Sequence, residues 1–260
     1  MKLPIYQIDA FTSRLFGGNP AAVVPLDNWL ADQVLQAIAA ENNLSETAFV
    51  LAQTNPARLR WFTPELEVDL CGHATLAAAH VMFSEYFPRQ SEITFKTRSG
   101  TLRVVRSGSL LMMEFPSRPG KPVSVSADQI AALGARPREA LQARDLLLVF
   151  DSEAEVRAMR PDFDRIANLD TFAVIVSAPG SKADFVSRFF APRAGVAEDP
   201  VTGSSHCTLI PYWAARLGKR TLLSHQLSRR GGELRCELRG ERVGIGGEVV
   251  EYLRGEINVG

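Results

Sequence analysis

Cys71-Gly72-His73-Ala74-Thr75 follows the stretch Phe62-Thr63-Pro64, and the chain carries a second, similar pair of stretches. The second pair reads Phe190-Ala191-Pro192 and Asp199-Pro200-Val201-Thr202-Gly203-Ser204-Ser205-His206. The phenylalanines of the two pairs are 128 positions apart and the motif glycines 131, while half of the 260-residue chain is 130. This spacing predicts two similar lobes, each bringing one helix start to a shared cleft, and makes the chain a candidate enzyme.

The composition excludes partners that are selected by bulk charge. Hydrophobic residues make up 46% of the chain, and 29 basic residues balance 29 acidic ones, so neither nucleic acid nor a membrane surface is an expected partner. Three cysteines are too few for a disulfide framework. No stretch approaches the ~18 apolar residues of a membrane span, and the N-terminus lacks a signal-peptide pattern. We therefore expect a cytoplasmic protein.

Periodicity predicts many short strands and one all-apolar helix in each half. Strands are expected at 5–11, 21–25, 47–51, 59–62, 93–97, 101–106, 110–115, 146–150, 172–177, 185–189, 226–228, 233–238, 243–246 and 249–253. Helices are expected at 30–40, 74–83, 126–133 and 162–167 and after Gly203, where Pro211 predicts a kink or a late start. The pattern predicts an α+β fold in which each half wraps a curved, mostly antiparallel sheet around a central helix.

Prolines and a glycine between residues 116 and 125 mark the expected crossing between the lobes. We assign residues 1–117 to an N-terminal lobe and 118–248 to a C-terminal lobe. A last strand over 249–260 is expected to complete the N-terminal lobe.

The two motif glycines suit sites that bind a carboxylate. A glycine at a helix start allows a sharp turn and leaves the first helical N–H groups without intrahelical partners. Gly72-His73-Ala74-Thr75 and Gly203-Ser204-Ser205-His206 both fit this description, so their backbones are candidates for gripping a small acid and stabilising enolate-like charge. Taken singly, each is more simply an ordinary helix start capped by Thr75 or Ser204, but the duplication favours function.

Four polar side chains are candidates for the chemistry. Glu46 stands at the start of an apolar strand, where desolvation would raise its basicity, although a solvated strand-end glutamate is the plainer interpretation. His73 lies at a predicted helix start and can exchange protons near neutral pH. Asp199 is either a loop cap or a neighbour of the second anion site. His206 stays open between a structural role and a second acid.

No metal and no organic cofactor are expected. Cys71, His73, His206 and Cys207 are ligand types, but Cys-x-His and His-Cys lack the usual zinc spacings, and no carboxylate cluster completes a site in the sequence. The glycines of Gly17-Gly18-Asn19-Pro20 do not match a dinucleotide or phosphate-binding loop.

Five stretches, in order along the whole chain, resemble the PhzF-like family of phenazine-biosynthesis-like proteins. They are Asp9-Ala10-Phe11, Gly17-Gly18-Asn19-Pro20-Ala21, Leu44-Ser45-Glu46-Thr47-Ala48-Phe49, Cys71-Gly72-His73-Ala74-Thr75 and Asp199-Pro200-Val201-Thr202-Gly203-Ser204. The resemblance implies a diaminopimelate-epimerase-like fold of two pseudo-symmetric lobes, cofactor-independent proton transfer and a homodimer. The family's founding activity isomerises a dihydro-hydroxyanthranilate.

The resemblance also implies roles for residues of this sequence. Glu46 corresponds to the family's acid/base, which moves a proton between two carbons. The polar partners of that acid/base are represented here by His73, Asp199 and Ser204. Asn19 corresponds to a wall of the cleft. The substrate-binding set is Asn19, Gly72, Ala74, Gly203 and Ser205.

Related epimerases place a cysteine before each motif glycine, whereas this chain has Cys71 before the first and Thr202 before the second. A threonine cannot supply a thiolate, so a two-thiol racemase is disfavoured. The leading hypothesis is an isomerase that moves a proton on a small carboxylated substrate with Glu46 as general acid/base. The alternatives are an amino-acid epimerase, with a contribution from Cys71 left open, and an interaction protein that retains the fold.

Overall fold

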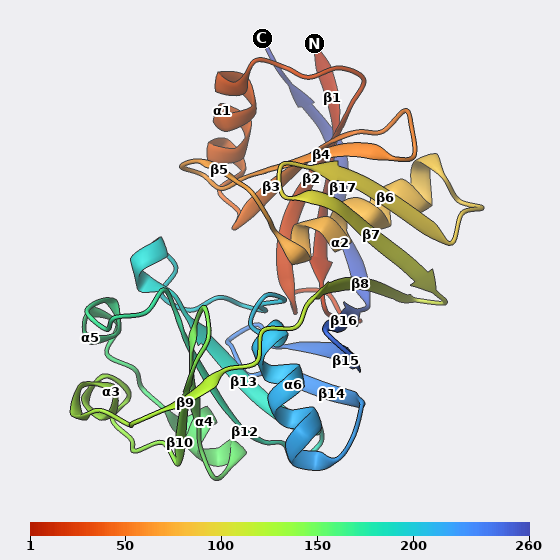
Figure 1. Ribbon diagram of the computed structural model, residues 1–260. Coiled ribbons are helices and arrows are strands. Elements are labelled where there is room, and N and C mark those ends of the chain that lie inside the picture. Colours follow the sequence, from red (N-terminus) through yellow and green to blue (C-terminus); the bar gives the residue numbers. More distant parts are fainter. The chain divides into compact units, whose positions relative to one another are not determined.

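The computed structural model describes residues 1–260, which divide into two compact units. Unit 1 comprises Met1–Glu114 and Gly246–Gly260, and unit 2 comprises Phe115–Ile245. Each unit has its own sheet and its own central helix (Figure 1).

Unit 1 is a mixed sheet with two helices. Its elements are β1 (Lys2–Ala10), β2 (Asn19–Leu26), α1 (Asp32–Asn42), β3 (Glu46–Leu51), β4 (Ala57–Phe62), β5 (Glu67–Val68), α2 (Gly72–Val81), a π-helical turn (Met82–Tyr86), β6 (Glu92–Thr97), β7 (Gly100–Ser107), β8 (Leu110–Pro116) and β17 (Val249–Asn258). The sheet runs β17-β1-β2-β3-β4-β6-β7-β8, parallel at β2–β3 and at β4–β6 and otherwise antiparallel. Because β17 pairs with β1, the two chain ends lie side by side (Figure 1).

Helix α1 covers one side of the β2–β3–β4 region. It buries Leu35 and Ala39 in an apolar cluster that includes Val24 and Phe49. The helix begins at Asp32 after Ala31, which makes no side-chain cap. It ends at Asn42, two residues beyond the predicted end, where Asn43 takes the left-handed conformation with φ 48°.

Helix α2 is the central helix of unit 1. It packs against β1, β2 and β3, and eight of its ten residues are buried because its sequence is apolar on almost every side. The predicted helix over 74–83 therefore exists, but it begins earlier, at Gly72, with Cys71 in the extended N-cap conformation. This placement puts the first sequence motif at the N-terminus of a buried helix.

The turn between β1 and β2 needs its glycine. Gly18 has φ +63°, and a Cβ there would lie 2.1 Å from the carbonyl oxygen of Ala10. Asp9 fastens the same turn, because its buried carboxylate accepts a hydrogen bond from the N–H of Phe16 at 3.1 Å. The turn thus fixes where β2 begins, at Asn19.

Unit 2 repeats the mixed-sheet plan. Its elements are β9 (Lys121–Val123), α3 (Ala127–Leu133), β10 (Glu139–Gln142), β11 (Leu146–Val149), α4 (Glu153–Ala158), α5 (Phe163–Ala167), β12 (Val174–Pro179), β13 (Phe185–Phe190), a 3-10 turn (Pro192–Ala194), α6 (His206–Leu217), β14 (Thr221–Gln226), β15 (Gly232–Arg239) and β16 (Arg242–Gly247). The sheet runs β9-β10-β11-β12-β13-β14-β15, parallel at β11–β12 and β13–β14. The sequence did not predict β9, β10 or α4.

Helix α6 packs on the unit 2 sheet through Trp213. The indole stacks on Phe185 of β13 at 5.6 Å and donates to Ser177 Oγ of β12 at 2.9 Å. Pro211 sits inside this helix and cannot donate to the carbonyl of Cys207. The backbone N–H of Arg118 takes that place at 2.8 Å, so the helix accommodates the proline without leaving the carbonyl unpaired.

The mixed sheets and few helices confirm the expected α+β class. None of the helices has the length and apolar character that crossing a membrane requires.

Candidate active site

Glu46 begins β3, and its side chain is 18% exposed, so it is not the solvated strand-end glutamate of the plainer interpretation. The strand pairs in parallel with β2, with Glu46 opposite Ala21. Because side chains alternate along a strand, Asn19 and Ala21 face the same side of the sheet as Glu46. Asn19 is completely buried there, at the first position of β2.

His73 meets Glu46 from the N-terminus of α2. Its Nε2 lies 2.9 Å from Glu46 Oε2, and its side chain is 9% exposed. Oε2 is buried, and no donor is aligned with it as a full hydrogen bond requires. The two predicted residues are therefore brought together as a close ion pair with unused acceptor capacity on the carboxylate.

Cys71 lies close to both nitrogens of the same imidazole. Its Sγ is 3.5 Å from His73 Nδ1, and the side chain is buried. Burial, followed by the negative charge of Glu46, raises the pKa of the Cys71 thiol to about 11. A thiol with this pKa is protonated near neutral pH, which disfavours it as a nucleophile or base.

The electrostatics of the pair correct one expectation. Burial alone would raise the pKa of Glu46, but the charge and proximity of His73 outweigh it and hold that pKa below the usual range. Burial likewise disfavours a charged His73, yet its contacts with Cys71 and Glu46 raise its pKa well above the usual value. Glu46 is therefore an ionised carboxylate beside an imidazolium, rather than a carboxyl made more basic by desolvation.

The start of α2 supplies the backbone of this site. The first hydrogen bond of the helix runs from Thr75 N to Cys71 O at 3.2 Å, so the N–H groups of Gly72 and His73 precede the intrahelical ladder. Gly72 is partly exposed, whereas Ala74 is completely buried.

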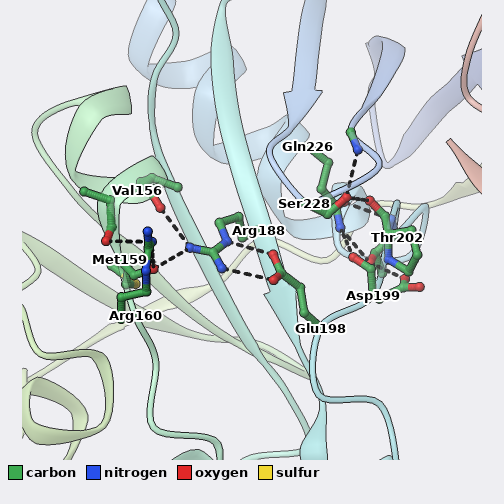
Figure 2. A network of polar contacts seen from close by, with 12 residues as sticks. Val156, Met159, Arg160, Arg188, Glu198, Asp199, Thr202, Gln226 and Ser228 are labelled. Atoms are coloured by element: carbon green, nitrogen blue, oxygen red, sulfur yellow. Dashed lines mark hydrogen bonds and ion pairs between the residues drawn. The ribbon is translucent and has the colours of Figure 1, made fainter. Parts of the chain in front are cut away.

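The second motif forms its own polar network in unit 2 (Figure 2). The Thr202 hydroxyl donates to the Asp199 carboxylate in a short hydrogen bond. Gln226 accepts from Thr202 N at 2.9 Å and donates to Asp199 O at 2.9 Å. Ser228 Oγ adds a bond to Pro200 O at 2.6 Å. The loop that carries Asp199 is thus fastened to the end of β14 and the residues just after it.

A buried arginine fastens the same loop from the other side. Arg188 of β13 donates two hydrogen bonds to the Glu198 carboxylate, from Nε at 2.7 Å and from Nη2 at 3.0 Å (Figure 2). Its Nη1 donates to the carbonyls of Val156 and Met159 at 3.2 and 2.9 Å. Glu198 precedes Asp199 directly, and Asp199 N donates to Phe189 O at 3.0 Å.

Helix α6 begins later than the motif predicted. It starts at His206, preceded by a tight turn in which His206 N donates to Gly203 O and Cys207 N to Ser204 O, three residues back in each case. Ser204 is partly exposed, but the Ser205 hydroxyl is buried and donates to Thr202 O at 2.8 Å. Any contact of Ser205 with a substrate would therefore come from its backbone. The two motifs are related but not equivalent helix starts.

His206 is a structural histidine. Its Nδ1 lies 2.9 Å from Thr202 O and its Nε2 2.9 Å from Ser224 Oγ, inside a completely buried environment. Burial lowers its pKa to about 4, so it stays neutral. Of the two roles left open by the sequence, these contacts and the low pKa favour the structural one over a second acid.

The structure thus gathers the predicted residues into two clusters. Glu46, His73, Gly72 and Asn19 belong to unit 1, while Asp199, Gly203 and Ser204 belong to unit 2. The sequence interpretation missed Arg188, Glu198 and Gln226. One signal was available for Arg188, which is the single charge in the otherwise uncharged, mostly apolar strand Phe185-Val186-Ser187-Arg188-Phe189-Phe190.

The comparisons with known proteins agree on one family. Residues 8–255 match the sequence profile described as phenazine biosynthesis-like protein. The chain is 54% identical over 260 residues to an uncharacterized isomerase of Pseudomonas aeruginosa, with 100% of each chain covered. It is 39% identical over 288 residues to the human phenazine biosynthesis-like domain-containing protein, with 99% of each covered.

Solved structures give the same result for the fold. A crystal structure of a PhzF-family phenazine biosynthesis protein from Enterococcus faecalis superposes with a TM-score of 0.98 at 45% identity, covering 100% of both chains. A predicted epimerase from Pseudomonas aeruginosa has a TM-score of 0.76 at 21% identity over 99% of this chain and 100% of that one, a likeness of fold alone. The expected epimerase-like fold is confirmed, and the named relatives support an isomerase- or epimerase-type function. The chain belongs to the PhzF-like family of phenazine biosynthesis-like proteins.

Proposed function

We propose that this chain is an isomerase that moves a proton on a small carboxylated substrate, with Glu46 as the general acid/base. The observation that carries the proposal is the 2.9 Å contact between Glu46 and His73 at the N-terminus of buried helix α2. The relatives named isomerases support the reaction class. The substrate itself is taken only as far as its carboxylate.

Glu46 is a better proton acceptor than the neighbouring thiol. The low pKa of Glu46 means that the carboxylate is ionised before the substrate binds, whereas the Cys71 thiol is protonated. Thr202, which stands before the second motif glycine, has its hydroxyl bonded to Asp199. Neither motif therefore offers a thiolate, and the carboxylate is left as the base.

The reaction would proceed through an enolate-like state. Glu46 takes a proton from a carbon of the substrate, and negative charge moves toward the substrate carboxylate. The backbone N–H groups of Gly72 and His73, at the positive end of α2, stabilise that charge. His73 keeps Glu46 ionised and in place, and Glu46 then returns the proton to another carbon.

The remaining predicted roles stay predictions of this proposal. They concern Asp199 and Ser204 as polar partners, and Asn19, Ala74, Gly203 and Ser205 as binding residues. The proposed assembly is a homodimer, which light scattering coupled to gel filtration would test on the purified chain.

Solvent exchange tests the role of Glu46. The wild-type chain would be incubated in deuterated water with a dihydro-hydroxyanthranilate and with a panel of small carboxylic acids, in the presence of a metal chelator. We expect the wild type to incorporate deuterium into at least one of them and Glu46→Gln to lose at least about 100-fold in rate. Glu41→Gln, at an exposed position of α1, is the matched control and should exchange like the wild type.

Two outcomes would contradict the proposal. Equal exchange in Glu46→Gln and the wild type removes Glu46 as the base. Loss of exchange in Cys71→Ala with full exchange in Glu46→Gln would instead favour a thiol-assisted epimerase, for which the 3.5 Å approach of Cys71 to His73 is the structural basis.

A further inference from the structure

Three different kinds of metal ligand converge in unit 1. Glu46 comes from β3, while Cys71 and His73 come from the start of α2, and one ligand atom from each lies within 4.8 Å of the other two. His73 Nε2 is 2.9 Å from Glu46 Oε2 and 3.9 Å from Cys71 Sγ. With zinc bonds of about 2.0 to 2.3 Å, two ligands of one tetrahedral ion lie roughly 3.5 Å apart. The observed separations bracket that value.

The carboxylate also has unused capacity at this point. Glu46 Oε2 is buried without an aligned donor. A buried anionic oxygen is costly unless a cation compensates it, and the His73 imidazolium does so here from 2.9 Å. A zinc ion held by the three side chains would displace the imidazolium proton and take over that compensation.

The donor set selects the ion. One sulfur, one imidazole nitrogen and one carboxylate oxygen suit Zn²⁺, and three protein ligands leave a fourth position open. We propose that Glu46, Cys71 and His73 form a zinc-binding site, and that zinc bound there blocks proton transfer by occupying Glu46. The proposed zinc binding does not depend on the enzyme's activity, whereas the proposed inhibition of proton transfer by zinc rests on the proposed function.

The second motif supplies a matched comparison within the same chain. It also places a cysteine beside a histidine, Cys207 and His206, but both ring nitrogens of His206 are engaged by Thr202 and Ser224. Thr202 takes the position before the motif glycine that Cys71 takes in unit 1. Removal of Cys207 should therefore leave zinc binding unchanged.

Metal titration of the full chain tests the site without a substrate. Reduced, chelator-treated protein would be titrated with Co²⁺, whose thiolate-to-metal charge-transfer absorption reports a bound cysteine, and with Zn²⁺ by calorimetry. We expect one ion per chain in the wild type and in Cys207→Ser. Cys71→Ser should lose the thiolate absorption, and Glu46→Gln and His73→Asn should each lower the affinity at least about tenfold.

The proposal is overturned by a wild type that shows neither the absorption nor the heat of binding. It is also overturned if Cys207→Ser abolishes the absorption or if Cys71→Ser keeps it. Circular dichroism would verify that each variant is folded, and Cys71→Ala replaces the serine variant if that one is not. If zinc binds as described but the metal-free wild type exchanges no deuterium, the zinc site stands and the proposed function fails.

Discussion

Glu46 and His73 form a buried contact of 2.9 Å between the first residue of a strand and the second residue of a helix. The contact reverses what burial would do to each group, since it keeps the carboxylate ionised and the imidazole protonated. The helix start and the parallel β2–β3 pairing bring the two residues together, so the geometry follows from the fold and does not depend on a flexible loop.

The histidines should therefore titrate in a fixed order. We expect His73 to stay protonated well above its usual pKa, His80 to titrate below the usual value because burial disfavours its charge, and His206 to titrate at about 4. Nitrogen-15 NMR of the imidazoles, in chelator, would measure all three. Glu46→Gln should lower the pKa of His73 and leave that of His206 unchanged, and an unmoved His73 would contradict the pairing.

The stability of unit 2 should fall in mild acid because of His206. The unfolded chain binds a proton at the ordinary value of 6.5, while the folded chain does so only at about 4. The contribution of neutral His206 is complete above pH 6.5 and is lost as the pH falls to about 4, a loss of about 3 kcal/mol at 1.36 kcal/mol per unit. Urea unfolding at several pH values measures it.

His206→Asn is the comparison for that measurement. It removes the titrating group, so the difference in unfolding free energy between the wild type and the variant should shrink as the pH falls from 6.5 to 4. A difference that is independent of pH would show that His206 is not held neutral.

Gln226 should be essential to the loop of the second motif. Gln226→Leu keeps a similar volume but leaves the buried N–H of Thr202 without its acceptor. An orphaned buried donor costs about 1 to 3 kcal/mol. Gln33→Leu, at an exposed position of α1, is the control and should change the stability by less than about 0.5 kcal/mol. Equal losses of unfolding free energy in the two variants would show that the hydrogen bond between Thr202 N–H and Gln226 contributes nothing to stability.

The sequence predicted the parts of this fold that depend on local pattern. Short apolar runs predicted β3 and β4, and the longer all-apolar run predicted α2 as a central helix. The four-residue strand β10 and the six-residue helix α4 were missed, because so few residues carry little periodic signal.

The candidate site shows the same division between residues that the sequence pattern selects and contacts that only the tertiary structure creates. Glu46 and His73 were both selected as candidates, but their contact and the low pKa of Glu46 are properties of the tertiary structure. Unusual Cys/His spacing and the lack of a carboxylate cluster in the sequence predicted no metal site. The fold brings the Glu46 carboxylate from β3 to Cys71 and His73, which no local spacing could show.

Arg188 should support unit 2 more strongly than an exposed ion pair. Its side chain is 10% exposed, and the guanidinium binds both oxygens of Glu198 and two carbonyls of the α4 region. Arg188→Met leaves Glu198 largely buried and unpaired, so we expect a loss of about 3 kcal/mol in the free energy of unfolding. Arg235→Met, which breaks an ion pair whose side chains are 50% and 45% exposed, should cost less than about 1 kcal/mol.

A double variant separates the ion pair from the carbonyl contacts. Arg188→Met with Glu198→Met removes both charges, and the chain should regain part of the lost stability because no unpaired carboxylate remains. If the loss of unfolding free energy in the double variant equals the sum of the losses in the two single variants, Arg188 acts mainly through the carbonyls of Val156 and Met159. Recovery of the full wild-type stability would instead show that those carbonyl contacts contribute little, and that the role of Arg188 is to hold Glu198 and, through it, the loop of Asp199.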